Sequence, residues 1–341
     1  SKHSGLSHNT IYSIIHTKEK QTYVGTYNGL CRYIAESGKF EDIFLPVTHG
    51  ISNLFVNSLL EDTVRQCIWI GMEGYLLQYT PETGKMVAIE VFHNNSIKSL
   101  ALDGNGNLLA GTDNGLYVYQ NNEEPLQHII HDSRNIQSLT NNIIWNIFSD
   151  QEHNIWLGTD YGISLSRYNS ALQFVPISQI TGTGDGNQFY SLFRDSKGMY
   201  WFGGTNGLLR FIHPTGNRHE AVWYRMGDKA HPLSHNRIRH IYEDKEQQLW
   251  IATDGSINRY DYTTQEFVHY NIIDSTGTYN TNWAYYIFED DSGNLWIATC
   301  LGGIFVVDKH KLMQSKVGQY VAEYNYSIHN GLSGMFINQI I

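Results

Sequence analysis

The chain of 341 residues repeats one pattern seven times, and this repetition limits the available folds more than any other feature. Each copy has a polar turn, an apolar strand, a turn that contains Asp, and a short aromatic strand ending in Gly-Thr or a similar pair. Clear copies read Leu139–Asp150 followed by Ile155–Thr159, and Leu233–Asp244 followed by Leu249–Thr253. A period of this length indicates one supersecondary unit per copy.

The register of the repeat is kept along the chain. The small residue after the aromatic strand recurs at spacings of 46, 40, 47, 45, 49 and 46 residues, at Gly25, Gly71, Gly111, Gly158, Gly203, Ala252 and Ala298. The apolar residue in the middle of the preceding strand stands 11 residues earlier in six copies and 12 in the second copy. The two strands are therefore joined by a hairpin of nearly fixed length.

Four short strands in each repeat of about 45 residues are typical of a propeller blade. We therefore expect an all-β fold, a seven-bladed β-propeller with four antiparallel strands per blade, which would close a ring without an exposed edge. The propeller is placed at residues 1–329, with blades near 5–46, 50–92, 94–132, 138–178, 186–228, 232–272 and 280–328.

Residues 330–341 repeat the opening motif of the chain, Gly5–Ile15. They are interpreted either as the first strand of a following repeat or as a strand that closes the ring. We favour the following repeat, because the first blade already has a complete first strand.

Composition excludes several classes of function. Lys and Arg number 23 against 33 Asp and Glu, for a net charge of −10, so this domain is not expected to bind nucleic acid or contact a membrane. The three cysteines have no short spacing, and the turns Asp103–Asn107 and Asp290–Asn294 lack the bidentate Glu of a calcium loop. We expect no metal and no cofactor, and interpret these turns as Asx turns.

The Trp of the second strand recurs in five copies, as Trp69, Trp156, Trp201, Trp250 and Trp296. A residue fixed by the repeat serves the packing of the repeat, so we interpret these rings as contacts between strands and blades and not as sugar platforms.

The motif Gly-Leu-Ser-His-Asn-x-Ile-x-x-Ile at Gly5–Ile14, with its counterpart at Leu233–Ile241, resembles the regulator-propeller repeat. That repeat is typical of the sensor regions of hybrid two-component systems in Bacteroides-type bacteria, and the resemblance covers essentially the whole chain.

The resemblance implies the periplasmic ectodomain of an inner-membrane histidine kinase that senses oligosaccharides derived from glycans. In that family a second propeller and a β-sandwich of the same polypeptide follow, the full receptor is expected to be a homodimer, and the full-length protein has kinase activity. It implies no enzyme activity for this fragment and transfers no site residues.

One position offers a place to look for a ligand. Two residues before the central apolar residue of the first strand, the packing pattern gives way to aromatic, cationic and amide side chains: Tyr12, Asn57, Lys98, Trp145, Tyr190, Arg239 and Tyr285. Such a mixture suits a carbohydrate, whose C–H faces stack on aromatic rings while its hydroxyls form hydrogen bonds. The alternative is that these side chains only fill a central channel.

The loop leading into the first strand and the turn between the second and third strands should open at the same end of a blade. They add four candidate ligand-binding residues, Arg237, Asp160, Tyr161 and Asn206, and no catalytic residue. Trp145, Tyr190, Arg239 and Tyr285 are favoured because they come from consecutive repeats.

Three other functions remain open for the same scaffold. A carbohydrate-active enzyme, such as a glycoside hydrolase or lyase, needs a pair of carboxylates, whereas here they are scattered one per repeat. A protein-binding or dimerisation scaffold would show an exposed apolar rim. A spacer would leave recognition to another part of the receptor.

Overall fold

The computed structural model describes residues 6–8, 10–45, 54–120, 127–181, 186–212, 221–229, 232–315, 319–330, 332, 334–337 and 339. The chain divides into two compact units. The N-terminal unit comprises Ser1–Gln179, Gly184–Gly186 and Ile341, and the C-terminal unit comprises Ile180–Thr183 and Asn187–Ile340. Repeats one to four therefore belong to the N-terminal unit, and repeats five to seven to the C-terminal unit.

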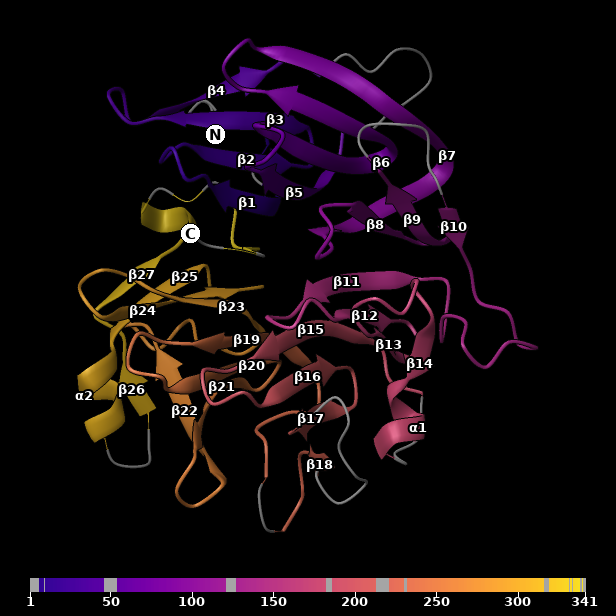
Figure 1. Cartoon of the computed structure of the whole chain (residues 1–341). Coiled ribbons are helices and arrows are strands. Elements are labelled where there is room, and N and C mark those ends of the chain that lie inside the picture. The colour runs from indigo at the N-terminus through magenta and orange to yellow at the C-terminus, as the bar shows by residue number, and fades with distance from the viewer. Residues whose placement is uncertain are drawn as a thin grey trace. The chain divides into compact units, whose positions relative to one another are not determined.

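Two repeats of the N-terminal unit form four-stranded antiparallel sheets in chain order (Figure 1). The first sheet contains β1 (Ile11–His16), β2 (Thr22–Thr26), β3 (Gly29–Ile34) and β4 (Lys39–Ile43). The other contains β11 (Ile144–Ser149), β12 (Ile155–Thr159), β13 (Gly162–Ser166) and β14 (Phe174–Pro176), and helix α1 (Ile177–Thr181) follows it.

The second and third repeats share one six-stranded sheet, with the strand order β10-β9-β8-β7-β6-β5. Its strands are β5 (Val56–Asp62), β6 (Cys67–Thr80), β7 (Lys85–Leu102), β8 (Leu108–Thr112), β9 (Gly115–Tyr119) and β10 (Gln127–Ile129). The long strand β7 pairs with β6 over its first part and with β8 over its last part.

The expectation of seven blades is wrong, although the four-strand blade itself is confirmed. Within the described ranges the structure is a β-propeller with five blades built from single repeats, namely the first, fourth, fifth, sixth and seventh. The boundary expected near residues 92–94 is absent from the described backbone, because residues 85–102 contain no Gly or Pro that would end a strand.

The C-terminal unit contains three sheets. The fifth repeat forms β15 (Phe189–Arg194), β16 (Tyr200–Gly204), β17 (Gly207–Phe211) and β18 (Ala221–Tyr224). The sixth forms β19 (Ile238–Glu243), β20 (Leu249–Thr253), β21 (Ser256–Asp261) and β22 (Glu266–Ile273). The seventh forms β23 (Ala284–Glu289), β24 (Asn294–Thr299), β25 (Ile304–Asp308) and β27 (Tyr324–Tyr326).

The connection from β25 to β27 leaves its own blade. It forms helix α2 (Lys309–Gln314) and then β26 (Gln319–Val321), which pairs in parallel with β22 and gives the sixth repeat a fifth strand. The 3₁₀ helix η2 (Ile328–Asn330) follows β27. The seventh repeat is thereby fastened to the outer edge of the sixth.

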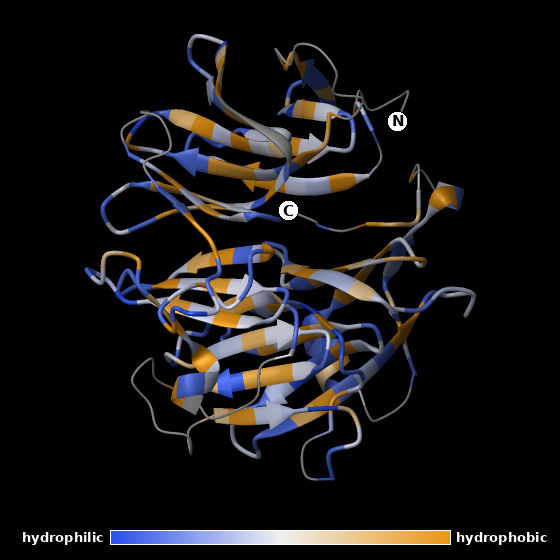
Figure 2. Cartoon of the chain, turned by 90° about the vertical axis from the view of Figure 1, so that its right-hand side faces the viewer, coloured by the Kyte–Doolittle hydropathy of each residue, from blue (hydrophilic) through white to orange (hydrophobic). Residues whose placement is uncertain are grey.

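Buried apolar residues alternate with more polar ones along the first strand of each repeat, and Figure 2 shows apolar and polar residues alternating along the strands. Of its inward positions, Val56, Ile97, Ile144, Phe189, Ile238 and Ala284 are buried, and Ile11 is half-buried. These residues form the apolar cores of the repeats together with the second and third strands.

The recurring Asp and Trp form one structural unit. In five repeats the Trp Nε1–H donates to the second carboxylate oxygen of the turn Asp, at 2.8–3.1 Å, in the pairs Trp69–Asp62, Trp156–Asp150, Trp201–Asp195, Trp250–Asp244 and Trp296–Asp290. The first oxygen accepts backbone amides of the turn, as Asp290 does from Ser292 and Asn294. These contacts agree with the interpretation as Asx turns and packing aromatics.

The marker glycines allow neighbouring repeats to approach each other closely. A Cβ atom built on Gly25 would lie 2.5 Å from Val56 Cγ1, and one on Gly203 would lie 2.5 Å from Ile238 Cγ2. Side chains also join consecutive first strands, since the Ser13 hydroxyl accepts the Leu59 amide at 3.1 Å and the Ser99 hydroxyl accepts the Ile147 amide at 3.0 Å. Conserved spacing in the repeat therefore reflects packing between repeats.

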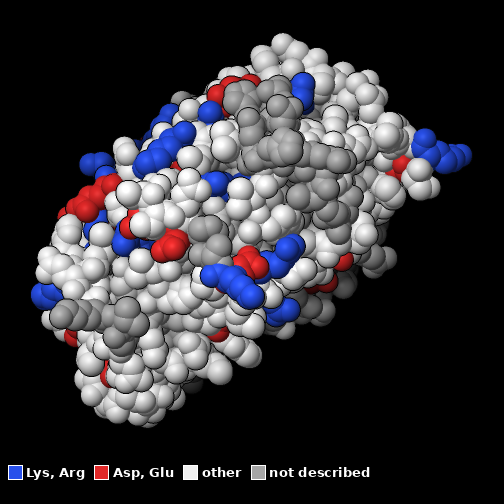
Figure 3. All heavy atoms as spheres, turned by 90° about the horizontal axis from the view of Figure 1, so that it is seen from below, with Lys and Arg blue, Asp and Glu red and all other residues white. Residues whose placement is uncertain are grey.

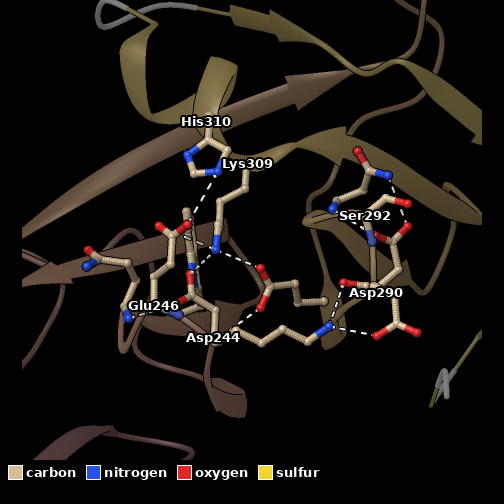
Figure 4. A network of polar contacts seen from close by, with 12 residues as sticks. Asp244, Glu246, Asp290, Ser292, Lys309 and His310 are labelled. Atoms are coloured by element: carbon tan, nitrogen blue, oxygen red, sulfur yellow. Dashed lines mark hydrogen bonds and ion pairs between the residues drawn. The ribbon is translucent and has the colours of Figure 1, made fainter.

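A buried ion cluster fastens α2 to two blades of the C-terminal unit. Figure 4 shows the Lys309 amino group pointing toward the carboxylates of Asp244 and Glu246, with His310 beside Glu246. Lys309 Nζ lies 2.6 Å from Glu289 Oε1 and 3.2 Å from Asp244 Oδ2, and all three side chains are at most 3% exposed. Because the charges are paired at this burial, the cluster can hold the helix in one position.

Residues 330–341 are described only in part. Within 332, 334–337 and 339 no strand is formed, and the Ile337 amide donates to the Thr299 carbonyl at 3.1 Å. The two interpretations of this segment stay predictions.

Figure 3 shows basic and acidic side chains interspersed on the face it displays.

Candidate functional site

The candidate ligand positions share one local frame. At the end of the second strand the Thr159 hydroxyl donates to the Gly162 carbonyl at 2.8 Å, and the Asp160 amide donates to the Ile143 carbonyl at 3.0 Å. The second bond joins the turn to the loop that leads into the first strand, so both segments lie at the same end of the blade, as predicted. Gly162 has φ 101°, which the tight turn requires.

In the N-terminal unit the structure brings three candidates into one chain of contacts. Lys98 Nζ lies 4.7 Å from the centroid of the Trp145 ring, and Trp145 Nε1 donates to Asp160 Oδ1 at 3.0 Å. Trp145 is 37% exposed, and the neighbouring Tyr161 is 53% exposed. The Asp160 carboxylate therefore orients an indole ring whose free face is open to solvent.

Tyr12 belongs to a different part of the N-terminal unit. Its ring lies 6.0 Å from that of Phe55, which in turn lies 4.0 Å from that of Tyr27. No contact between Tyr12 and Lys98 is found among the described residues. Asn57, from the strand between them, donates to the Ser96 hydroxyl at 2.9 Å.

In the C-terminal unit the same strand position builds a tighter cluster. Arg239 makes a bidentate contact with Asp254, with Nε at 2.7 Å from Oδ1 and Nη2 at 3.2 Å from Oδ2. The Arg239 guanidinium lies 4.3 Å from the centroid of the Tyr285 ring, and Arg237 Nε lies 3.9 Å from Asp254 Oδ2. Pairing and stacking together fix the plane of the Arg239 guanidinium.

Tyr190 faces the same charges. Burial raises the pKa of its hydroxyl, and the positive charges of Arg239 and Arg237 offset that rise only in part. The hydroxyl oxygen is buried, and no hydrogen-bond partner for it is found in the described part of the chain. An unmet buried hydroxyl costs free energy, which a ligand group that bonds to it would recover.

Two carboxylates orient these clusters. Asp160 holds Trp145, and Asp254 holds Arg239, so each acts as an acceptor that fixes a neighbouring side chain. For Arg239, burial lowers the pKa, but the hydrogen bond and charge of Asp254 raise it more, and the net shift is upward. The arrangement is suited to binding and holds the guanidinium charged.

The remaining candidate, Asn206, stands apart from Arg239. Its backbone groups bond to neighbouring residues: the Asn206 N–H donates to Asn187 Oδ1 at 2.8 Å, and the Asn206 carbonyl accepts from Arg225 Nε at 3.1 Å. The structure thus groups Lys98, Trp145 and Asp160 in one unit and Tyr190, Arg237, Arg239 and Tyr285 in the other. Tyr12 and Asn206 lie outside these groups.

Sequence reasoning gave too little weight to three residues. Asp254 is not among the candidates predicted from the sequence, although it organises the arginine cluster. Phe336 packs against Tyr285, with ring centroids 5.3 Å apart, and nothing in the repeat predicts this contact. Trp283 directly precedes the first strand of the seventh repeat, where its large exposed ring could have been noticed.

A larger pocket lies at the other end of the blades. It has a volume of 820 Å³ and is bordered by Lys18, Arg32, Glu61 and Asp62 from the first two repeats. Three of its charged side chains already have partners, since Arg32 pairs with Glu41, Asp62 pairs with Arg65, and the Glu61 carboxylate accepts the Lys18 amide. We therefore keep the candidate site at the opposite end, where the variable side chains lie.

The fold defines a repeat protein of propeller blades, on which the variable position of the first strand gathers polar and aromatic side chains. A family model described as "Two component regulator propeller" matches residues 138–161, 232–255 and 278–300. A histidine kinase of Formosa agariphila is 25% identical over 288 residues, which are 80% of this chain and 20% of that protein.

Solved structures extend this comparison. The extracellular domain of a putative hybrid two-component system from B. thetaiotaomicron is 81% identical, with a TM-score of 0.49, and the match covers 100% of this chain and 46% of that one. Virginiamycin B lyase of Staphylococcus aureus is 13% identical with a TM-score of 0.60 over 85% of this chain and 92% of that one, which shows a shared fold alone.

Three segments of the chain match the two-component regulator propeller family. Its sequence relatives confirm the prediction of an extracytoplasmic sensor domain of a hybrid two-component system. The chain spans about half the length of the related extracellular domain and a fifth of the related kinase. Among the described residues no helix is both long and apolar enough to cross a membrane.

Proposed function

We propose that this domain recognises an oligosaccharide derived from a glycan and that binding signals to a histidine kinase outside this chain. The observation that carries the proposal is the cluster of Tyr190, Arg239 and Tyr285 around Asp254. All three come from the one position of the first strand that packing leaves free to vary. Similarity to a sensor family supports the receptor part of the proposal.

The chemistry of the cluster fits a sugar. The Arg239 guanidinium is held flat by Asp254 and Tyr285, so its remaining N–H groups can donate to sugar hydroxyls at little entropic cost. The Tyr190 hydroxyl has no hydrogen-bond partner among the described residues, and it can form a hydrogen bond with the ligand. In the N-terminal unit, the exposed rings of Trp145 and Tyr161 offer faces for the C–H side of a sugar.

The rest of the receptor enters the proposal through the family. In it, a second propeller and a β-sandwich follow this domain in the same polypeptide, two receptors form a homodimer, and the full-length protein has kinase activity. A longer ectodomain is consistent with the 46% coverage of the related extracellular domain.

The direct test is calorimetry of the 341-residue chain, and of the longer ectodomain, against a panel of oligosaccharides from different glycan classes. We expect heat with one class and no turnover. Release of shortened products on chromatography would instead identify a carbohydrate-active enzyme, and absence of binding by both proteins would overturn the proposal.

Tyr190→Phe gives the sharpest variant, because the Tyr190 hydroxyl has no hydrogen bond to lose among the described residues. The variant should keep its stability and lose about two- to tenfold in affinity, the range that corresponds to one neutral hydrogen bond. Trp145→Ala and Arg239→Ala should weaken binding further.

Arg259→Ala is the matched control for Arg239→Ala. Arg259 belongs to the same repeat, and its Nη1 donates to Gln248 Oε1 at 2.9 Å, away from the variable position. It should leave affinity unchanged. Equal affinities of the Tyr190, Trp145 and Arg239 variants and the parent chain would show that the ligand binds elsewhere.

A further inference from the structure

A second concave site lies in the seventh repeat, beside the arginine cluster. It has a volume of 270 Å³ and is bordered by Tyr279, Asn280, Asn282, Trp283, Leu301 and Gly302. It combines two aromatic rings with two side-chain amides, and Trp283 is 47% exposed. Aromatic faces beside amides are the chemistry that binds a neutral sugar.

The backbone of Trp283 is strained. Its φ is 56°, in the left-handed region that a bulky side chain rarely adopts. The residues at the same place in the other repeats, Thr10, Phe55, Ser96, Ile143, Gln188 and Arg237, are all described and none has a positive φ. Such strain persists only where the surrounding contacts impose it.

The contacts that impose it differ from those of the other repeats. The amides of Ile143 and Arg237 donate to the side chains two residues earlier, Asn141 and His235. The Trp283 amide instead donates to the Asp254 carbonyl at 3.0 Å. The Trp283 carbonyl accepts the Cys300 amide at 3.0 Å, a bond that other repeats share, as between the Asp160 amide and the Ile143 carbonyl. The leading loop of the seventh repeat is thus tied to the turn of the sixth, and the indole is turned outward.

The same bonds place the pocket next to the candidate site. Asp254 receives the Trp283 amide on its carbonyl and the Arg239 guanidinium on its carboxylate. Gly302 allows the turn to lie close to the leading loop, because a Cβ atom there would lie 2.7 Å from the Asn280 carbonyl oxygen. The arginine cluster and the pocket are therefore two adjoining parts of one surface.

We propose that Trp283 is the stacking platform of a second sugar subsite, in which Asn280 and Asn282 bond to the hydroxyls of the next residue of the oligosaccharide. The inference rests on the proposed function and assigns the ligand a length of at least two sugar units. The Arg239 cluster then binds one unit and the Trp283 pocket its neighbour.

The test compares variants of the full chain against the oligosaccharide that calorimetry selects and against the corresponding monosaccharide. Trp283→Gly removes the ring and suits the positive φ, so it should be as stable as the parent or more stable. It should lose about tenfold in affinity for the oligosaccharide and almost none for the monosaccharide. Trp283→Phe keeps an aromatic face and should stay within about threefold of the parent.

Three results would overturn the subsite. Trp283→Gly could bind the oligosaccharide like the parent while Tyr190→Phe and Arg239→Ala weaken binding, in which case the proposed function stands alone. A large loss of stability in Trp283→Gly would make the indole a packing residue. If neither the parent chain nor the longer ectodomain binds an oligosaccharide, the proposed function falls together with the subsite. The indole N–H signal of Trp283, assigned with Trp283→Phe, should shift on titration.

Discussion

The two units of this protein follow the same repeat but differ at three positions that hold repeats together. In the N-terminal unit the buried turn Asp62 pairs with the partly exposed Arg65, the second repeat has Gly71 at the close approach, and Ser99 bonds the next strand. In the sixth repeat of the C-terminal unit these roles fall to Lys309, Ala252 and His240, while the fifth repeat keeps a glycine, Gly203, at the close approach. The repeats thus keep the same contact with different residue types. Substitutions and acid should therefore change the stability of the two units by different amounts.

Replacement of Lys309 should have the largest effect. Lys309→Ala leaves Asp244 and Glu289 buried without their shared cation, and we expect a loss of about 3–5 kcal/mol of stability in the C-terminal unit. Arg65→Ala should cost about 0.5–1.5 kcal/mol, because Asp62 keeps its bonds from Trp69 and from turn amides.

Urea unfolding monitored by tryptophan fluorescence, with amide hydrogen exchange to separate the units, measures both variants. Similar losses for Lys309→Ala and Arg65→Ala would contradict the difference that burial implies.

The close approach between repeats gives an intermediate effect. A Cβ atom at Gly71 would lie 2.6 Å from Ile97 Cγ2, so Gly71→Ala should destabilise the N-terminal unit by about 1–3 kcal/mol. Gly334→Ala is the control, because nothing lies within 4 Å of that Cβ position. Thermal unfolding by calorimetry checks both, and a Gly71→Ala chain as stable as Gly334→Ala would show that the neighbouring side chains can move to accommodate a Cβ atom.

The regular parts of this structure follow from the sequence. The apolar first strand that recurs in each repeat supplies core residues such as Val56, Ile144 and Ile238, and the spacing of six or seven residues between Asp and Trp is explained by their hydrogen bond. The fused strand β7 was missed, because the end of a strand depends on backbone pairing that His93 and Asn94 neither favour nor forbid.

The candidate site was predictable to a similar degree. The variable position of the first strand indicated Arg239 and Tyr285 as candidate residues, and the structure shows that they are in contact. Their ligand stays a prediction. The conformation of Trp283 could not be predicted, because alignment of the repeats places it with Arg237 and gives no sign of a positive φ. That difference arises from hydrogen bonds between segments about 30 residues apart.

The smallest predicted effect is a difference between the two units in how their stability depends on pH. His240 Nδ1 accepts the Ile287 amide at 3.3 Å, where the N-terminal unit uses the hydroxyls of Ser13 and Ser99. Burial lowers the pKa of His240 to about 3 from 6.5, and its ring stacks on Tyr286 at 3.9 Å. The imidazole is thus held neutral in the folded chain, and a protonated Nδ1 could not accept the amide.

The sign of the effect follows from that shift. The unfolded chain binds the proton more tightly, so the stabilisation is fully present above pH 6.5 and declines as the pH falls from 6.5 toward about 3. Because the side chain is partly exposed, we expect a loss on the order of 1–2 kcal/mol at pH 4.5. The turn residues Asp62 and Asp290 have pKa values below the ordinary 3.8, so their contributions to the pH dependence of stability lie below this window.

Hydrogen exchange of the Ile287 amide should therefore accelerate between pH 6.5 and 4.5 after correction for intrinsic exchange, while that of Ile147 should not. His240→Ser, which copies the N-terminal unit, should remove the difference; if it persists in that variant, another group controls the acid sensitivity.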